Sequence, residues 1–156
     1  MLREEIKDEL KDLAFDFFYW FSRFEFALKE NKILKRKEAG ENAEPGWESF
    51  VENYANKFVH TKETEKLLVL SPKRQKIGQN SELEWRDVGL QDCQSELCKV
   101  IRLLKIIRNN LFHGGKHGAD DWDNPARTKE LLSVGKLILD QLAKVAAFEE
   151  DYKQCY

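Results

Sequence analysis

The residues with the clearest chemistry stand close together in one segment, IIRNNLFHGGKH, at positions 106–117. Arg108 brings a guanidinium, which is always charged and whose planar fork matches phosphate oxygens. His113 brings an imidazole, which near neutral pH can take or give a proton. Asn109 can either orient that imidazole or hold a phosphate oxygen. The three side chains together therefore suit chemistry on a phosphodiester.

Their spacing predicts that they share one end of a helix. Asn109 and His113 are four residues apart and lie on the same helix face, and Arg108 lies one residue round. Gly114 and Gly115 follow, and a glycine readily forms the left-handed cap that ends a helix. The glycines also leave space for a polymer backbone to approach. The helix dipole favours the charged form of His113, whereas the neighbouring cations oppose it.

The same predicted helix carries a basic face. The face opposite its apolar stripe holds Lys99, Arg102, Ile106, Asn109 and His113, with Lys105 and Arg108 beside it. Between positions 99 and 117 there are five Lys or Arg residues and no Asp or Glu. One reading is a solvated face, as for most charged helix faces. The other is a surface that binds RNA, with contacts from Lys99, Arg102, Lys105 and Lys116.

Periodic apolar residues predict helices over about 2–28, 47–58, 61–70, 90–114 and 125–151. The stripe of the fourth helix steps by three and four through Leu90, Cys93, Leu97, Val100, Leu104, Ile107 and Leu111. Asn124 and Pro125 form an N-cap and a first helical residue. The last helix should turn inward Leu132, Leu137 or Ile138, Leu142, Val145 and Phe148. Segment 71–89 is predicted to be a loop and 35–44 a linker, and no strand is expected.

The predicted fold class is therefore all-α, an up-and-down bundle of four or five helices in a single domain, 1–156. Length, a net charge of −2 and 42% hydrophobic residues fit a soluble globular chain. We expect neither a signal peptide nor a membrane span. The odd number of cysteines (Cys93, Cys98 and Cys155) indicates reduced thiols and a cytoplasmic location.

The first helix combines charges with an unusual density of aromatic residues. Arg23 and Glu25 interrupt a belt of Phe15, Phe17, Phe18, Tyr19, Trp20, Phe21, Phe24 and Phe26. This belt covers more than one helix face, so the bundle or a partner subunit must bury it. Charges inside it need partners. Arg23 and Glu25 either pair structurally or support Arg108 or His113 from behind.

The pattern R-N-x-x-x-H at positions 108–113 resembles the signature of the HEPN superfamily, helical domains of which many are metal-independent ribonucleases. The long first helix, with FSRFEFALKE at 21–30, also resembles stand-alone bacterial HEPN proteins. One position departs from some HEPN toxins. Those toxins carry a tyrosine two residues after the histidine, where a nucleotidyltransferase antitoxin modifies them, and this chain has Gly115.

The resemblance implies an endoribonuclease with a catalytic Arg108, Asn109 and His113. A ribose 2′-hydroxyl would attack its own 3′-phosphate while two histidines transfer protons. Because one chain supplies one well-placed histidine, the resemblance implies a homodimer with both motifs in one cleft. Its context would be stress response or anti-phage defence, with an antitoxin or another defence protein as partner. The alternatives are a non-catalytic HEPN-like module that binds RNA, a nucleotide or a partner, and a purely structural dimer.

Other combinations of residues give weaker predictions of a functional site. His113 and His117, with Asp120, Asp121 and Asp123, could bind a metal only if the helix continued through two glycines, so no metal and no cofactor are expected. GGKH lacks the other parts of a phosphate-binding loop. His60 is expected at a surface or helix boundary. The basic segment 71–76 is either solvated or an additional RNA contact.

Overall fold

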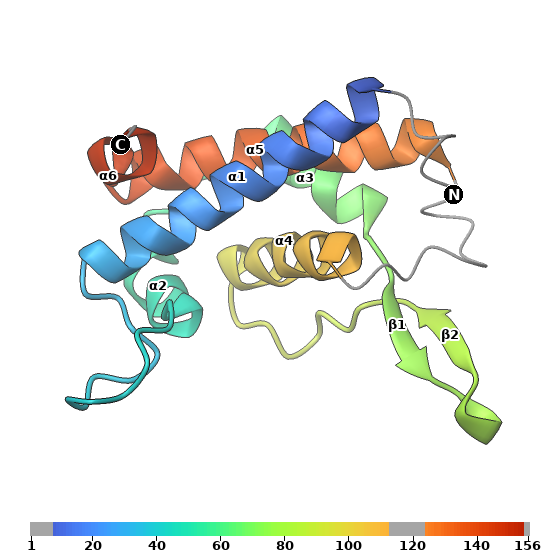
Figure 1. Cartoon of the computed structure of the whole chain (residues 1–156), viewed down its shortest axis with the longest axis horizontal. Helices are drawn as coiled ribbons and strands as arrows, with labels where there is room; N and C mark the ends of the chain where they lie inside the picture. The colour runs from blue at the N-terminus through green and yellow to red at the C-terminus, as the bar shows by residue number, and fades with distance from the viewer. Residues whose placement is uncertain (1–7, 113–123, 155–156) are drawn as a thin grey trace.

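The computed structural model describes residues 8–112 and 124–154. The helices are α1 (Asp8–Glu30), α2 (Trp47–Tyr54), α3 (Lys62–Leu70), α4 (Glu96–Phe112), α5 (Pro125–Val145) and α6 (Glu149–Lys153). Two strands, β1 (Arg74–Ile77) and β2 (Leu83–Arg86), form an antiparallel hairpin between α3 and α4 (Figure 1). The mainly helical architecture is confirmed. This architecture is compatible with the predicted all-α class, whereas the expectation that the chain has no strand is wrong, because the hairpin is present.

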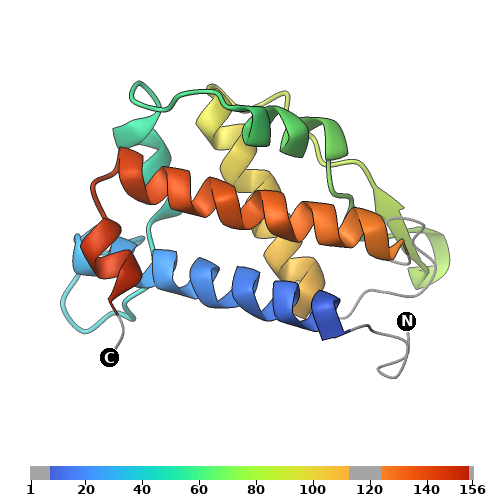
Figure 2. The same cartoon turned by 90° about the horizontal axis from the view of Figure 1, so that it is seen from above.

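The helices are not all aligned along one bundle axis. In Figure 2, α1 and α5 run side by side, α3 follows the other side of α5, and α4 crosses this layer at a steep angle. α1 and α5 approach closely at Gly135, where an added Cβ would lie 2.6 Å from Cε2 of Phe17. The predicted up-and-down arrangement therefore describes α1, α3 and α5 better than it describes α4.

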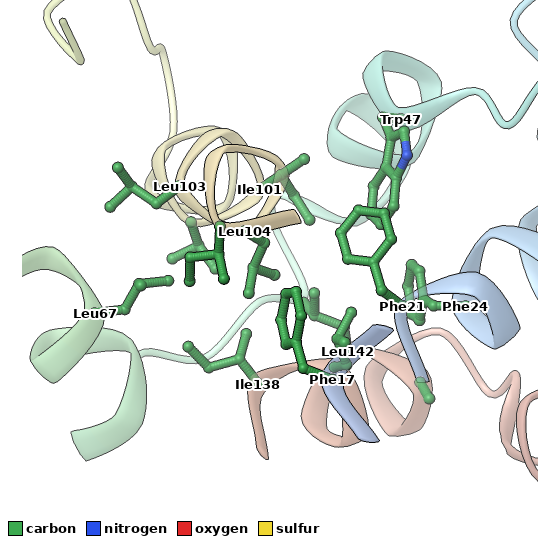
Figure 3. Packing of buried hydrophobic residues seen from close by; sticks show 14 of the residues in the cluster. Phe17, Phe21, Phe24, Trp47, Leu67, Ile101, Leu103, Leu104, Ile138 and Leu142 are labelled. Atoms are coloured by element: carbon green, nitrogen blue, oxygen red, sulfur yellow. The ribbon is translucent and has the colours of Figure 1, made fainter. Parts of the chain in front are cut away.

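The core lies where α4 meets the layer of α1 and α5. Figure 3 shows Phe17 of α1 pointing toward α4, which contributes Leu104, and Phe21 lying beside Trp47 of α2. α4 is buried around most of its circumference, through Leu97, Val100, Ile101, Leu103, Leu104, Ile106, Ile107 and Asn110. Of the two residues of α5 that could face inward, Ile138 does so: it is fully buried, whereas Leu137 is 50% exposed. Burial of these side chains is the main force that holds the helices together.

Local side-chain bonds set several helix ends. Asn124 caps α5 by accepting hydrogen bonds from the backbone of Ala126 and Arg127, as predicted. Helix α4 begins at Glu96 rather than near 90, because Ser95 accepts a hydrogen bond from the backbone N–H of Cys98. The predicted end of α4 at Gly114 lies outside the described residues.

The predicted last helix is two helices. Its chain breaks after Val145, where Ala147 adopts a positive φ of 56°. The following Phe148 is only 3% exposed. Its ring packs near Phe24, Phe50 and Tyr54. The turn therefore ends α5 and allows the ring of Phe148 to be buried.

The hairpin occupies the segment predicted to be a loop. Gln75 pairs with Trp85 and Arg74 with Arg86, and Asn80 adopts a positive φ of 53° in the connection. Apolar and polar residues alternate in β2, but each strand has only four residues, so the period-two pattern is too short to stand out from the surrounding polar segment. Likewise, 35–44 is no open linker: the bridge between Leu34 and Pro45 closes this segment into a loop.

Candidate functional site at the end of helix α4

Arg108 lies in the last two turns of α4, held between two residues of α1. Its guanidinium is centred 5.4 Å from the ring of Phe21, within cation–π range. One terminal nitrogen lies 3.6 Å from a carboxylate oxygen of Glu25, which makes an ion pair rather than a hydrogen bond. The side chain is 31% exposed, and its buried Nε has no hydrogen-bond partner among the described residues. Arg108 is thus held in place, and its terminal nitrogens donate no hydrogen bond to a described residue.

Glu25 connects this arginine to α2. The same carboxylate oxygen that faces Arg108 accepts a hydrogen bond of 3.0 Å from Nε1 of Trp47. Trp47 is buried and packs 5.3 Å from Phe21, ring centre to ring centre. Glu25 is therefore fixed by the core and lies beside Arg108, as one reading of the first helix predicted.

Arg23 faces a different part of the molecule. Its guanidinium donates hydrogen bonds to the backbone carbonyls of Asp151 and Tyr152 at α6, and it lies 4.6 Å from the ring of Phe26. These contacts attach α6 to α1. The support that one of the two charged residues was predicted to give Arg108 is therefore seen at Glu25, and the described contacts of Arg23 lie at α6 and Phe26.

The other members of the motif are only partly described. Asn109 is half-buried, lies on the side of α4 that faces α2 and the hairpin, and makes no side-chain hydrogen bond to any described residue. His113 and Lys116 lie outside the described residues, as do His117, Asp120, Asp121 and Asp123 of the possible metal site. Elsewhere in the described chain, no group of three His, Cys, Asp or Glu side chains is arranged to hold a metal ion.

Arg102, one of the predicted RNA contacts, does not present a free guanidinium. It donates two hydrogen bonds to the carboxylate of Asp92, at 2.6 and 2.8 Å, and a third of 2.6 Å to the carbonyl oxygen of Gly89. These bonds lower the pKa of Asp92 from 3.8 to about 2, chiefly through the side-chain bond to Arg102. Arg102 thus joins the loop before α4 to the helix through a bidentate ion pair, and its contact with RNA stays a prediction.

The two remaining cations of the basic face are still available. Neither Lys99 nor Lys105 makes an ion pair with any described residue, and both are half-buried. Lys105 also lines the cavity described next. The predicted basic face is therefore smaller than its sequence suggests, and its apolar member Ile106 is only 6% exposed.

A cavity of about 820 Å³ runs along this side of α4. Helix α2 and the hairpin form its other walls, and in Figure 1 they flank α4 on its two sides. The α4 wall includes Arg102, Lys105, Ile106 and Asn109. Trp85 and Arg74 come from the hairpin. Arg74 belongs to the basic segment 71–76, for which an RNA contact was one of two alternatives, whereas sequence reasoning missed Trp85 because it assigned it to a loop. Pockets of this size take ligands as large as a nucleotide.

The aromatic belt of α1 has a buried side and an exposed side. Phe17, Phe21 and Phe24 are almost fully buried, whereas Phe15 is 66% and Phe18 39% exposed. Phe18 packs 5.0 Å from Phe112, the residue before His113, which is itself 57% exposed. Tyr19 continues the exposed set. We refer to Phe15, Phe18, Tyr19 and Phe112 as the aromatic patch.

Two further predictions concern His60 and the cysteines. His60 lies before α3 and its Nδ1 is 2.9 Å from a carboxylate oxygen of Glu96, which fits a helix boundary. The sulfurs of Cys93 and Cys98 are 2.7 Å apart, a contact that their five-residue spacing alone did not indicate. Burial and the second thiol raise the pKa of Cys93 to about 11.

No protein-family model, curated protein or solved structure matches this chain in the comparisons with known proteins. Within 8–112 and 124–154, no helix is long and apolar enough to cross a membrane. The arrangement around Arg108 and the cavity therefore carry the functional interpretation.

Proposed function

We propose that this chain is a metal-independent endoribonuclease of the HEPN type, with Arg108, Asn109 and His113 as catalytic residues. In the proposed reaction the 2′-hydroxyl of a ribose attacks the adjacent 3′-phosphorus and the bond to the 5′-oxygen breaks. The products are a 2′,3′-cyclic phosphate and a free 5′-hydroxyl. One histidine accepts the proton of the 2′-hydroxyl, and another gives a proton to the leaving oxygen.

The environment of Arg108 is the observation that carries this proposal. Glu25 and Phe21 hold the guanidinium at one end of α4, yet none of its nitrogens donates a hydrogen bond to a described residue. Turning it toward a phosphate oxygen would therefore break no hydrogen bond in the described part of the chain. A preorganised guanidinium of this kind stabilises negative charge that develops in a transition state.

The aromatic patch supports the second part of the proposal, a homodimer. Exposed apolar surface beside a site is typical of an interface that a partner covers. Phe112 belongs to the patch and directly precedes His113, so an isologous contact across it would bring the two histidines near each other. We therefore expect the chain to sediment at twice its mass at micromolar concentration. Phe18→Glu should shift it toward the monomer, whereas Val69→Glu, at an exposed apolar position on α3, should not.

The direct test is incubation of the purified protein with total RNA in EDTA. The proposal expects cleavage that persists in EDTA, spares DNA and leaves 2′,3′-cyclic phosphate ends. His113→Ala should abolish it. Activity that EDTA removes and a divalent metal restores would contradict the proposal and favour a metal site at His113, His117 and Asp120.

A mixed dimer tests whether both subunits act on one phosphate. A dimer of one wild-type chain and one His113→Ala chain, isolated with two different tags, retains one of two histidines. Losing one proton-transfer group typically costs about 10²-fold or more. The mixed dimer should therefore be nearly as inactive as the double variant. A rate near one half of wild type, with subunit exchange excluded, would show that the two sites work independently.

The second candidate is a non-catalytic HEPN-like module that binds RNA, a nucleotide or a partner. The cavity beside α4 favours it, because a site of about 820 Å³ can bind without cleaving. Retained RNA binding by a chain that leaves RNA intact in EDTA and in magnesium would select this candidate. An antitoxin or another defence protein as partner, and a role in stress response or anti-phage defence, follow from the resemblance alone.

A further inference from the structure

We propose that the cavity between α2, α4 and the hairpin binds an unpaired base of a single-stranded RNA, with Trp85 as its stacking surface and with Arg74 and Lys105 on the adjoining phosphate. The proposal deepens the proposed function and rests on it for the identity of the strand as RNA. It adds the hairpin as a part of the substrate site, which the basic face of α4 alone did not include.

Trp85 provides the stacking surface. It lies on β2, is half-buried and lines the cavity, so one part of its ring packs on the core and another part faces the cavity. Its partner across the hairpin is Gln75, which also lines the cavity and can bond the edge of a base. Stacking on an aromatic ring requires a base that is free of its own duplex.

Two cations face the cavity without an acidic partner. Neither Arg74 nor Lys105 makes an ion pair within the described ranges, although both line the cavity. Arg102 lines it as well, but Asp92 already occupies its guanidinium. Free cations beside an aromatic surface are the combination with which proteins hold single-stranded nucleic acid.

A hydrogen bond fixes which end of the cavity these cations occupy. The side-chain amide of Asn110 donates to the carbonyl oxygen of Lys73 at 2.9 Å. This bond ties the start of β1 to the last turns of α4, so Arg74 lies at the same end as Asn109 and Arg108. A phosphate bound by Arg74 would therefore belong to a nucleotide close to the cleavage site.

The opposite wall has the opposite charge. Helix α2 contributes Glu48 and Glu52, neither of which has an ion-pair partner in the described chain. Carboxylates repel phosphate but accept hydrogen bonds from the amino groups of bases. The opposite charges on the two sides of the cavity would therefore orient a bound nucleotide, with its phosphate toward Arg74 and Lys105 and the edge of its base toward α2.

The test is the binding of a short fluorescein-labelled RNA of mixed sequence, followed by anisotropy as a function of salt. The chain carries His113→Ala throughout, so that the RNA stays intact. Trp85→Ala should weaken binding to the single strand roughly 5- to 150-fold, and Trp85→Phe should weaken it less. The same RNA annealed to its complement should bind more weakly and should not respond to Trp85→Ala.

The hairpin offers a matched control for the cation. Arg74 and Arg86 are direct partners across the two strands, but Arg86 bonds Glu84 and does not line the cavity. Arg74→Ala should lower the slope of log affinity against log salt by about 0.7, the contribution of one phosphate contact on a single strand. Arg86→Ala should leave affinity and slope unchanged. This pair keeps the test valid if Trp85→Ala fails to fold.

Several outcomes would overturn the proposal. One is equal weakening by Arg74→Ala and Arg86→Ala, and another is unchanged affinity in folded Trp85→Ala. A free mononucleotide that competes as well as the labelled strand would assign the cavity to a small ligand instead. The proposed function is tested separately. RNA binding that depends on Trp85, with no cleavage by the wild-type chain, would contradict the proposed catalysis and support the cavity as a binding site. Cleavage by the wild-type chain, with binding that does not depend on Trp85, would support the catalysis and contradict the role of the cavity.

Discussion

Arg102 and Arg108 stand six residues apart on α4 and look equivalent in the sequence, but their surroundings differ. Arg102 donates three hydrogen bonds, two to Asp92 and one to the carbonyl oxygen of Gly89. Arg108 donates none to any described residue and has only an ion pair of 3.6 Å with Glu25. The first arginine is fully engaged in holding a loop, whereas the second is held in place with free donors.

The difference teaches that charge balance along a helix is decided outside it. No acidic residue occurs between positions 99 and 117, but Asp92 and Glu25 reach the helix from the preceding loop and from α1. The basic face was therefore overestimated at Arg102. The guanidinium of Arg108, with its weak partner, is the better candidate for charge stabilisation in a reaction.

The largest expected effect separates the two arginines by activity. Removing one transition-state donor typically costs about 10²- to 10³-fold in rate, so Arg108→Ala should lower RNA cleavage by that amount. Arg102→Ala should stay within about a few-fold of wild type, because its donors are already used by Asp92. Single-turnover cleavage in EDTA measures both. If Arg102→Ala lost as much activity as Arg108→Ala, in folded protein, the comparison would be wrong.

A smaller loss is expected when the partner of Arg108 is changed. Glu25→Gln keeps the shape and an oxygen that can accept from Trp47 but removes the charge beside the guanidinium. Exposed or partly exposed ion pairs contribute about 0.2–1 kcal/mol, so cleavage should fall by no more than about fivefold. A role in positioning predicts that the loss appears in kcat and that Glu25→Asp recovers part of it. The same fall after Glu30→Gln, at an exposed position at the end of α1 and outside the cavity lining, would point to a general charge effect instead.

The salt dependence of binding should distinguish Lys105 from Arg102. Lys105 has no ion pair with a described residue, so Lys105→Ala should lower the salt slope for single-stranded RNA by about 0.7. Arg102→Ala should leave the slope unchanged, since its charge is balanced by Asp92 in the free chain. Titrations of His113→Ala protein at four salt concentrations measure both slopes. A fall in slope for Arg102→Ala alone would reverse the assignment of the two cations.

Much of the helical scaffold could be predicted from the sequence, because apolar periodicity and capping residues act locally. The cap at Asn124 was read from such a signal and is confirmed, whereas the cap at Thr61 was found only in the structure. The hairpin was missed, because its strands have only four residues each and their alternation of apolar and polar residues is too short to be a clear signal. The break before α6 was missed because the burial of Phe148, a tertiary effect, determines it.

The candidate site was predictable only in part, for the same reason. The motif residues Arg108 and Asn109 were named from their types and spacing, and Glu25 was named as one of two alternatives for support. Arg74 was included only as part of the basic segment 71–76, and Asp92 and Trp85 were not named, because their places beside α4 depend on tertiary packing. Contacts between distant segments depend on how α4 crosses the other helices, which local spacing does not encode.

The smallest expected effect is on stability, and it concerns the engaged arginine. The folded chain lowers the pKa of Asp92 to about 2, below the ordinary value of 3.8, so the charged carboxylate contributes stability that is fully present above about pH 4. That contribution is lost as the pH falls through 2.

The melting temperature of wild type should therefore be higher than that of Asp92→Asn at pH 6. The difference between the two melting temperatures should shrink between pH 4 and pH 2. The matched control is Asp87→Asn, in the same loop, because Asp87 has no ion pair with a described residue. Since Asp92 is largely exposed, the difference should be small and should decrease with added salt. A difference between wild type and Asp92→Asn that stays constant from pH 6 to pH 2 would mean that Asp92 holds Arg102 by shape rather than by charge.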